Sequence, residues 1–437
     1  MKLGKEFKSL IGNNLVRNMA VYAISEGISK AMPLLILPLV AYFLSPAEFG
    51  MVTNFNVVCQ VLFAFTLLNT QTCLTVNYYK SDERERPRLI FNILFLILVL
   101  LGISSLTTIL ANRLIYKYTG LPLEWQLYAI IWVGFTALIY IYQEKLRLDE
   151  KAKKFGIYQF FQSFISAALT LLFVVFLRWG WHGRVDSLVL TAVVIGGYGL
   201  ISLYRSRSIF IQIDKDLLKS IFIFGIPLLP HTLSFWLKSG LDKLYITNSI
   251  SVSENGIFSF AGTLASIFYL FINAFFSAYS PYLFKNLTLI DNMTDNEMIR
   301  VIKIKLLNQV RYFLLFYLII NIIGYIAFKI IIELFFKLSY GESLTYLPWL
   351  LLSSFVTVFY AVFSSYVFYM KSTKILGLIT LSTAILQAFV NYFAVIKFGV
   401  MGIIFTSILV NILMAILVGI HSQRVYPMPW SYLFKFW

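Results

Sequence analysis

The chain has 437 residues, of which 59% are hydrophobic and 13% are charged, and its formal net charge is +16. A soluble protein carries about 25% charged residues, so this composition excludes a chain of soluble domains. Cys59 and Cys73 fall on one predicted helix, roughly 21 Å apart, which excludes a disulfide between them. With only these cysteines, no cysteine-based metal site is expected.

The N-terminal segment resembles a signal peptide in one respect, because Lys2, Lys5 and Lys8 precede apolar sequence. No small-x-small cleavage site follows, and the apolar run contains Arg17 and Glu26. We therefore expect this segment to be retained as the first membrane span.

Apolar runs long enough to cross a bilayer, about 20 residues each, recur from one end of the chain to the other. About twelve are predicted, at residues 15–44, 50–78, 89–110, 125–143, 157–177, 187–204, 217–249, 257–284, 307–330, 345–370, 375–396 and 400–420. The sequence therefore predicts an all-α integral membrane protein. An even number of spans places both termini on the same side of the membrane.

Basic residues indicate which side that is. About 26 lysines and arginines fall at the termini and in the loops on one side, and about 7 fall on the other. The positive-inside rule then predicts that both termini are cytoplasmic. The same asymmetry accounts for the net charge, so no nucleic-acid partner is expected. The basic residues assigned to the external side are Arg113, Lys117, Arg178, Arg184, Lys329, Lys337 and Lys397.

Two short motifs occur twice and in the same order. The pattern S-x-x-E-x-G covers residues 45–50 after the first span and 251–256 after the seventh. A basic-aromatic-Gly-x-x-Gly pattern covers residues 178–183 before the sixth span and 397–402 before the twelfth. These repeats predict two six-helix lobes related by a parallel pseudo-repeat. The predicted lobes are residues 1–206 and 207–437.

Charged residues occur inside two equivalent spans. Glu26 and Lys30 share a face of the first span, and Lys238 and Asp242 share a stripe of the seventh with His231. Each lipid-facing charge near the bilayer centre would cost about 2.5–3.5 kcal/mol. We therefore predict that these five side chains line a polar cavity between the lobes.

Other interpretations of these residues remain open. Glu26 with Lys30, and Lys238 with Asp242, have the i,i+4 spacing of ion pairs that serve helix packing alone. His231 fits a hydrogen-bonded packing residue as well as a proton-coupling group.

Three polar residues elsewhere are weaker candidates for the cavity. Asn56 and Gln60 on the second span also fit hydrogen bonding between helices. Arg311, at the cytoplasmic mouth of the ninth span, also fits a topology-setting charge.

Catalytic signatures are absent from the sequence. It contains no P-loop, no G-x-S-x-G, no paired histidines at metal-binding spacing and no C-x-x-C. We therefore expect a transporter without catalytic residues, metal site or cofactor, and leave open coupling to protons or sodium ions.

Several segments resemble one family. Residues 42–50 resemble the first external turn of bacterial O-antigen and exopolysaccharide flippases, the Wzx type. Residues 225–230, followed by Trp236, Asp242-Lys243 and residues 254–258, resemble that family's seventh span and the turn after it, and Gly399 and Gly402 its last turn. The family is part of the multidrug/oligosaccharidyl-lipid/polysaccharide exporter superfamily.

This resemblance implies a flippase in the bacterial cytoplasmic (inner) membrane that takes part in O-antigen, and so lipopolysaccharide, biosynthesis or in export of another surface polysaccharide. It would move undecaprenyl-diphosphate-linked oligosaccharide from the inner to the outer leaflet by alternating access. A cationic cavity is typical of the family, and Lys30, Lys238 and Arg311 are the matching candidates here. Glu26 and Asp242 make this cavity less cationic. The implied partners are the lipid-linked sugar, membrane lipid, and the polysaccharide polymerase and chain-length machinery.

Two alternatives share this composition. One is a drug or metabolite exporter of the same superfamily, with a smaller cavity. The other is an integral-membrane polymerase or ligase acting on lipid-linked sugars. Such enzymes usually carry a large external loop with catalytic residues, and every predicted external loop here is short.

Overall fold

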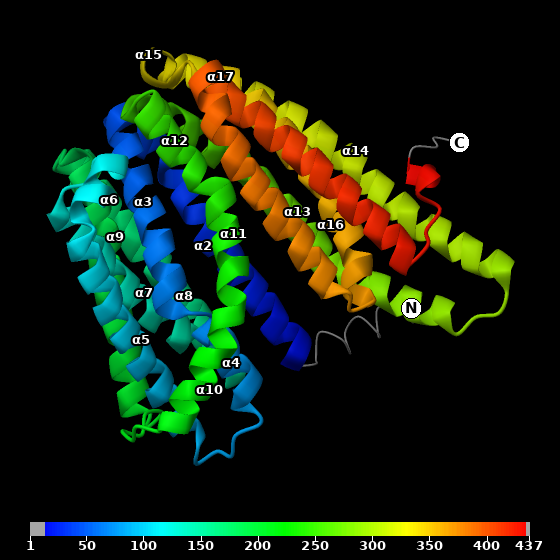
Figure 1. Cartoon of the computed structure of the whole chain (residues 1–437), viewed down its shortest axis with the longest axis horizontal. Helices are drawn as coiled ribbons and strands as arrows, with labels where there is room; N and C mark the ends of the chain where they lie inside the picture. The colour runs from blue at the N-terminus through cyan, green and yellow to red at the C-terminus, as the bar shows by residue number, and fades with distance from the viewer. Residues whose placement is uncertain (1–13, 434–437) are drawn as a thin grey trace. The chain divides into compact units, whose positions relative to one another are not determined.

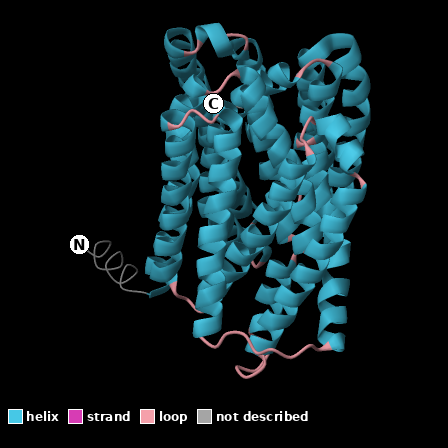
Figure 2. Cartoon of the chain, turned by 90° about the vertical axis from the view of Figure 1, so that its left-hand side faces the viewer, coloured by secondary structure: helices cyan, strands magenta, loops and turns pink. Residues whose placement is uncertain are grey.

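The computed structural model describes residues 14–433, and within them the chain is helical with no strand (Figures 1 and 2). The charged residues Lys2, Lys5, Lys8 and Lys435 lie outside the described residues. The described part forms two compact units, which divide after Trp236, within a helix. The predicted lobe boundary after residue 206 stays a prediction.

The first unit contains the helices up to the start of the broken seventh span. They are α2 (Asn14–Phe43), α3 (Pro46–Leu67), α4 (Thr70–Tyr78), α5 (Arg86–Leu110), α6 (Asn112–Thr119), α7 (Leu123–Leu148), α8 (Ala152–Thr170) with the π-helical turn Leu171–Phe176, α9 (Gly180–Arg205), α10 (Lys215–Gly225), the 3-10 turn Ile226–Leu228 and most of α11 (Leu229–Ser239).

The second unit contains the remaining helices. They are α12 (Leu241–Ser249), α13 (Val252–Asp291), α14 (Asn296–Phe335), α15 (Lys337–Tyr340), α16 (Ser343–Tyr369), α17 (Thr373–Val425) and the 3-10 turn Trp430–Leu433.

Eleven helical stretches of the described chain are long and apolar enough to cross a membrane. The last of them, α17, is 53 residues long and contains one break, at Gly399. This break divides α17 into two spans, which gives twelve in all. The predicted all-α, twelve-span fold is therefore confirmed.

Each S-x-x-E-x-G motif begins a helix. Ser45 precedes α3, and its hydroxyl accepts a hydrogen bond from the Glu48 backbone N–H, while the Glu48 carboxylate accepts from the Ser45 N–H. Ser251 precedes α13 and caps the Glu254 N–H in the same way. These side chains satisfy backbone groups that the start of a helix leaves unpaired. The repeat therefore records two equivalent helix starts.

Each basic-aromatic-Gly-x-x-Gly motif forms a turn that requires its first glycine. Gly180 and Gly399 both have a φ of +60°, a region where a Cβ is strained. Gly180 lies against Glu48, and Gly399 lies against Ile250, next to Ser251. In each unit the glycine turn therefore packs beside the helix start described above, as a pseudo-repeat requires.

The linker between the sixth and seventh spans packs against α4 and α5. Arg88 on α5 forms an ion pair with Asp214, and the Asn92 side chain bonds to the backbone of Gln212 and Asp214. Ile221 on α10 is buried in the same apolar core as α4 and α5. This packing explains why the compact unit extends beyond α9.

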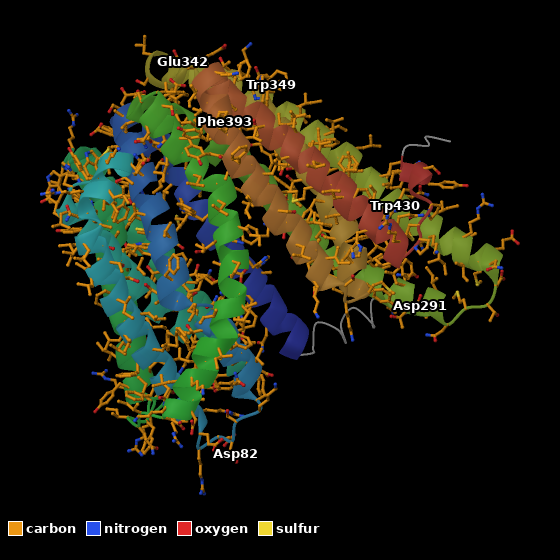
Figure 3. The ribbon with its side chains drawn as sticks, in the orientation of Figure 1. Asp82, Asp291, Glu342, Trp349, Phe393 and Trp430 are labelled. Carbon is orange, nitrogen blue, oxygen red and sulfur yellow. The ribbon has the colours of Figure 1, made fainter. Side chains whose placement is uncertain are left out.

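Three helix ends meet at one end of the second unit. The Asp291 carboxylate, at the end of α13, accepts hydrogen bonds from Tyr369 at the end of α16 (2.5 Å) and from Tyr426 just after α17 (3.1 Å). Burial and the Asp291 charge raise the pKa of Tyr426, so its hydroxyl stays protonated and donates. Figure 3 shows Asp291 and Glu342 at opposite ends of this unit. The C-terminal ends of α13, α16 and α17 therefore lie together, as expected if successive spans cross the membrane in alternating directions.

Candidate functional site

A buried carboxylate, Asp242, lies in the second unit near the start of α12 and is 5% exposed. Its Oδ1 accepts a hydrogen bond from Asn391 Nδ2 (2.6 Å), and its Oδ2 accepts one from Gln387 Nε2 (3.3 Å). Gln387 and Asn391 lie one turn apart on α17, so both amides present the same helix face. The carboxylate is therefore bound by neutral donors.

Asp242 lies beside a break in its own span, between α11 and α12 at Gly240. A break leaves backbone carbonyls without helical partners, which is costly inside a membrane. Gln387 Nε2 also donates to the Lys238 backbone oxygen (3.2 Å) and contacts Ser407 Oγ (3.1 Å). The Gln387 amide, on the first half of α17, therefore contacts both sides of the break in the seventh span, at Lys238 and Asp242. It also contacts Ser407 on the second half of α17.

Lys238, at the end of α11, does not pair with Asp242. Its Nζ lies 3.2 Å from the Met414 sulfur, and in the described chain it makes no ion pair. A thioether is a weak acceptor and carries no charge. The i,i+4 ion pair considered from the sequence is therefore not formed, and this half-buried ammonium has no acidic partner.

Glu26 and Lys30 are likewise not paired with each other. Glu26 accepts from Arg147 Nη2 on α7 at 3.0 Å, and Arg147 also contacts Glu144 at 3.3 Å. Lys30 is exposed and makes no ion pair within residues 14–433. The Glu26–Arg147 contact joins α2 to α7 within the first unit.

The remaining predicted residues are His231, Asn56 and Gln60 in the first unit and Arg311 in the second. His231 is exposed, and its ring contacts Phe235 edge to face. The Arg311 guanidinium lies 5.4 Å from the Tyr312 ring centre. Asn56 is half-buried and Gln60 exposed, and neither hydrogen-bonds to Glu26 or Lys30. The predicted cavity between the lobes stays a prediction.

The sequence interpretation missed Gln387 and Asn391. Both lie in the apolar run predicted at 375–396, and their four-residue spacing places two amides on one helix face. That spacing was the available signal, because paired amides are rare inside a membrane span. Their partner Asp242 lies far away along the chain, so the contact itself had no local signature.

Arg184 was assigned to an external loop, and the structure corrects this. Helix α9 begins at Gly180, seven positions before the predicted sixth span, so Arg184 lies inside the helix. The first turns of α9 are polar, which is why an apolar window excluded them. Arg184 lines a cavity of about 180 Å³ within the first unit, together with residues of α2, α7 and α8.

No group of three or more His, Cys, Asp or Glu side chains lies close enough to hold a metal ion between residues 14 and 433.

Solved structures similar to this chain are membrane transporters. An inward-facing multidrug resistance MATE family transporter of the MOP superfamily matches with a TM-score of 0.73, 16% identity, and coverage of 95% of this chain and 99% of that chain. The lipid II flippase MurJ, in an inward closed conformation, matches with a TM-score of 0.73, 12% identity, and coverage of 95% and 89%. At these identities the similarity shows the fold alone.

Two similar sequences come from Haemophilus influenzae. The "Lsg locus putative protein 1" is 22% identical over 276 residues, which are 62% of this chain and 66%, just under two thirds, of that relative. An uncharacterized membrane protein is 23% identical over 371 residues, covering 83% of this chain and 85% of that relative.

A family model described as "Polysaccharide biosynthesis protein" matches residues 15–287, more than half of the chain. This match includes both S-x-x-E-x-G helix starts and the span that carries Lys238 and Asp242, and it confirms the resemblance seen in the sequence. The chain is a multi-pass membrane protein that belongs to the polysaccharide biosynthesis protein family.

Proposed function

We propose that this protein is a flippase for undecaprenyl-diphosphate-linked oligosaccharide, the repeat unit of O-antigen or of another surface polysaccharide. Membership of a polysaccharide biosynthesis family supports the substrate class. The fold shared with a lipid II flippase supports the reaction, which moves a sugar head across the bilayer without chemical change. The protein is then a transporter rather than an enzyme.

The physical task explains why such a fold is needed. A sugar head that crossed hydrocarbon directly would leave its hydrogen bonds unmade, at several kcal/mol for each polar group. A polar path between two lobes, open sideways to lipid, allows the head to cross while the isoprenoid tail stays in the bilayer. Alternating access opens that path first to one side and then to the other.

The buried Asp242 carboxylate at a break in its span is the observation that carries the proposal. Broken spans and intramembrane ionisable groups are typical of transport sites. Because its hydrogen-bond donors are neutral amides, Asp242 can take up a proton or a sodium ion as co-transported substrate. Either would change the bonds that hold α11 and α12 to α17. We therefore assign coupling to Asp242.

The diphosphate contacts are assigned to basic residues of the spans. Within residues 14–433, neither Lys238 nor Lys30 forms an ion pair with a carboxylate. Arg311 is the third candidate, while Glu26, His231, Asn56 and Gln60 contribute polar lining. Polymerase and chain-length proteins would act on the translocated product.

The proposed setting is the bacterial inner membrane with both termini in the cytoplasm. Cysteines that replace Ala47 or Ser253 should be labelled from outside intact cells, whereas those at Asp82 or Asn292 should not. Figure 3 shows Asp82 in the loop after α4, well placed for a reagent on its own side. If the cysteines at positions 82 and 292 were labelled in intact cells, the proposed orientation would be wrong.

Export of a small molecule is the second candidate, because a multidrug transporter matches the fold as well as the lipid II flippase does. Deletion of the gene separates the two functions. Loss of a flippase removes the surface polysaccharide and leaves its lipid-linked repeat unit in the inner leaflet, and the wild-type gene restores both. Unchanged polysaccharide together with raised drug sensitivity would support the exporter instead.

A further inference from the structure

A cavity of about 180 Å³ lies inside the first unit, whereas Asp242 and Lys238 belong to the second. Helices α2, α7, α8 and α9 form its walls, and these helices pack on one another within the unit (Figure 1). Fifteen residues line it, of which Arg184 is the one charged member. The cavity therefore contains a fixed positive charge and no carboxylate.

Arg184 projects from the second turn of α9 and is bonded only in part. Its Nη1 donates to Thr170 Oγ1 (2.6 Å) and lies 3.5 Å from Ser187 Oγ. In residues 14–433 no carboxylate forms an ion pair with it, and its Nη2 and Nε have no hydrogen-bond partner. Guanidinium is always charged and has five donors, so most of its bonding capacity remains for a ligand.

Further hydrogen-bond donors line the same cavity. Thr136 and Ser166 contribute hydroxyls that donate to no group in the described chain. The Gln162 Oε1 accepts from Gln143 Nε2 (3.0 Å), which leaves the Gln162 NH₂ for the cavity. An acceptor-only, negatively charged group would use all of these donors. A neutral or cationic ligand would leave the guanidinium uncompensated.

We propose that this cavity is an oxyanion site that binds a single phosphate group, through the Arg184 guanidinium and the polar side chains of Thr136, Ser166 and Gln162. The planar fork of an arginine matches two phosphate oxygens at once. The volume is below the roughly 300–1,000 Å³ of drug-sized pockets, so it fits one phosphate with a few waters and excludes an oligosaccharide. The proposed site is therefore separate in kind from an oligosaccharide path, and it does not depend on the proposed transport function. The phosphate is either a free anion or a lipid headgroup.

The chain offers a matched control for the Arg184 charge. Arg178 lies six positions earlier in the turn before α9, is exposed, and does not line the cavity. Arg184→Gln and Arg178→Gln thus remove the same charge from neighbouring places. Thr136→Val keeps the side-chain shape and removes one cavity hydroxyl, so it tests the site even if Arg184→Gln folds poorly.

The first arm measures thermal unfolding of the purified full chain while inorganic phosphate replaces chloride at constant ionic strength. A ligand that binds only the folded state raises the unfolding midpoint in a saturable way. We expect this rise in the wild type and in Arg178→Gln. It should be weakened in Thr136→Val and absent in Arg184→Gln.

The second arm tests a lipid source by native mass spectrometry of protein released from phosphatidylglycerol or phosphatidylcholine nanodiscs. A headgroup site retains phosphatidylglycerol in the wild type and in Arg178→Gln, and loses it in Arg184→Gln. A phosphate shift alone identifies a free anion, and lipid retention alone identifies a headgroup. The proposal is overturned if the wild type shows neither a phosphate-dependent shift nor lipid retention. It is also overturned if Arg184→Gln and Thr136→Val leave the shift and the retention unchanged. Arg184 would then serve only to join helices through Thr170 and Ser187.

Discussion

Two aspartates of this protein are held in opposite ways. Asp149, in the loop between α7 and α8, accepts hydrogen bonds from Lys145, from Lys151 (2.7 Å) and from the Tyr78 hydroxyl. Burial would raise the pKa of Asp149, but these bonds, that of Lys145 first, outweigh it and lower the pKa to about 2. Asp242, inside a span, accepts hydrogen bonds from the neutral amides of Gln387 and Asn391 and forms no ion pair with any described residue.

The comparison distinguishes a carboxylate with a structural role from one whose hydrogen bonds permit it to bind a proton or a cation. Two ammonium groups fix Asp149 as an anion, so it fastens the end of α4 to the α7–α8 junction at every physiological pH. Amides stabilise a charge through dipoles alone, and they bond to a protonated or cation-bound carboxylate as well. Asp242 is therefore the group to which we assign a change of state that is linked to helix movement.

The largest expected effect is on transport by Asp242→Asn. This change keeps the size of the side chain but removes the group to which we assign uptake of the coupling ion, and it replaces one of the two oxygens that accept from Gln387 and Asn391 with an NH₂ donor. We expect export of surface polysaccharide to fall at least about tenfold, the equivalent of about 1.4 kcal/mol, with normal protein levels. Asp149→Asn is the matched control and should keep export. If Asp242→Asn exported polysaccharide at the wild-type level, the proposed difference in role between the two aspartates would be wrong.

Lys238 sharpens the comparison because, among the described residues, its ammonium forms no ion pair with a carboxylate. A phosphate about 4 Å away would gain roughly 4 kcal/mol at an effective dielectric of 20. Lys238→Ala should therefore lose most export, while Lys238→Arg should retain much of it. Complementation of a deletion strain measures both.

The double variant Lys238→Ala with Asp242→Ala tests the independence of the two side chains. Because the ammonium and the carboxylate do not form an ion pair, removing both should not restore export. Recovery in the double variant would mean that the lysine only neutralised its neighbour, and the diphosphate contact would have to be dropped.

Asp149→Asn should lower the free energy of unfolding by about 2 kcal/mol at pH 7, since its pKa drops from 3.8 to about 2 on folding. A depressed folded-state pKa gives stability that is present above about pH 4 and is lost as pH falls toward 2. Unfolding of the wild type in detergent should show this loss. In Asp149→Asn the part of the pH dependence that is due to this carboxyl should be missing. If the variant and the wild type had the same dependence of stability on pH, Asp149 would not have the structural role assigned to it.

The smallest effect is expected at Glu26. Its ion pair with Arg147 is half-exposed, with side-chain exposures of 42% and 45%, and exposed pairs contribute about 0–1 kcal/mol. Glu26→Gln should therefore change the unfolding free energy by less than about 1 kcal/mol. A larger loss would show that this contact fastens α2 as firmly as Asp149 fastens the loop.

Much of the fold was predictable from local features of the sequence. Apolar runs predicted the spans, and the repeated motifs predicted equivalent helix starts and turns because capping serines and positive-φ glycines act within a few residues. The contacts of the site were not predictable in this way. Asp242 with Asn391, and Glu26 with Arg147, join residues more than a hundred positions apart, and the i,i+4 spacing favoured nearer partners that the structure does not use.

The central claim is tested most directly with purified protein in vesicles that contain undecaprenyl-diphosphate oligosaccharide in both leaflets. A membrane-impermeant glycosidase outside removes sugar only from the outer leaflet. The account predicts that the wild-type protein, given a proton or sodium gradient, renders the inner pool accessible, while Asp242→Asn vesicles stay at the level of protein-free ones. Wild-type vesicles indistinguishable from protein-free vesicles under both gradients would contradict it.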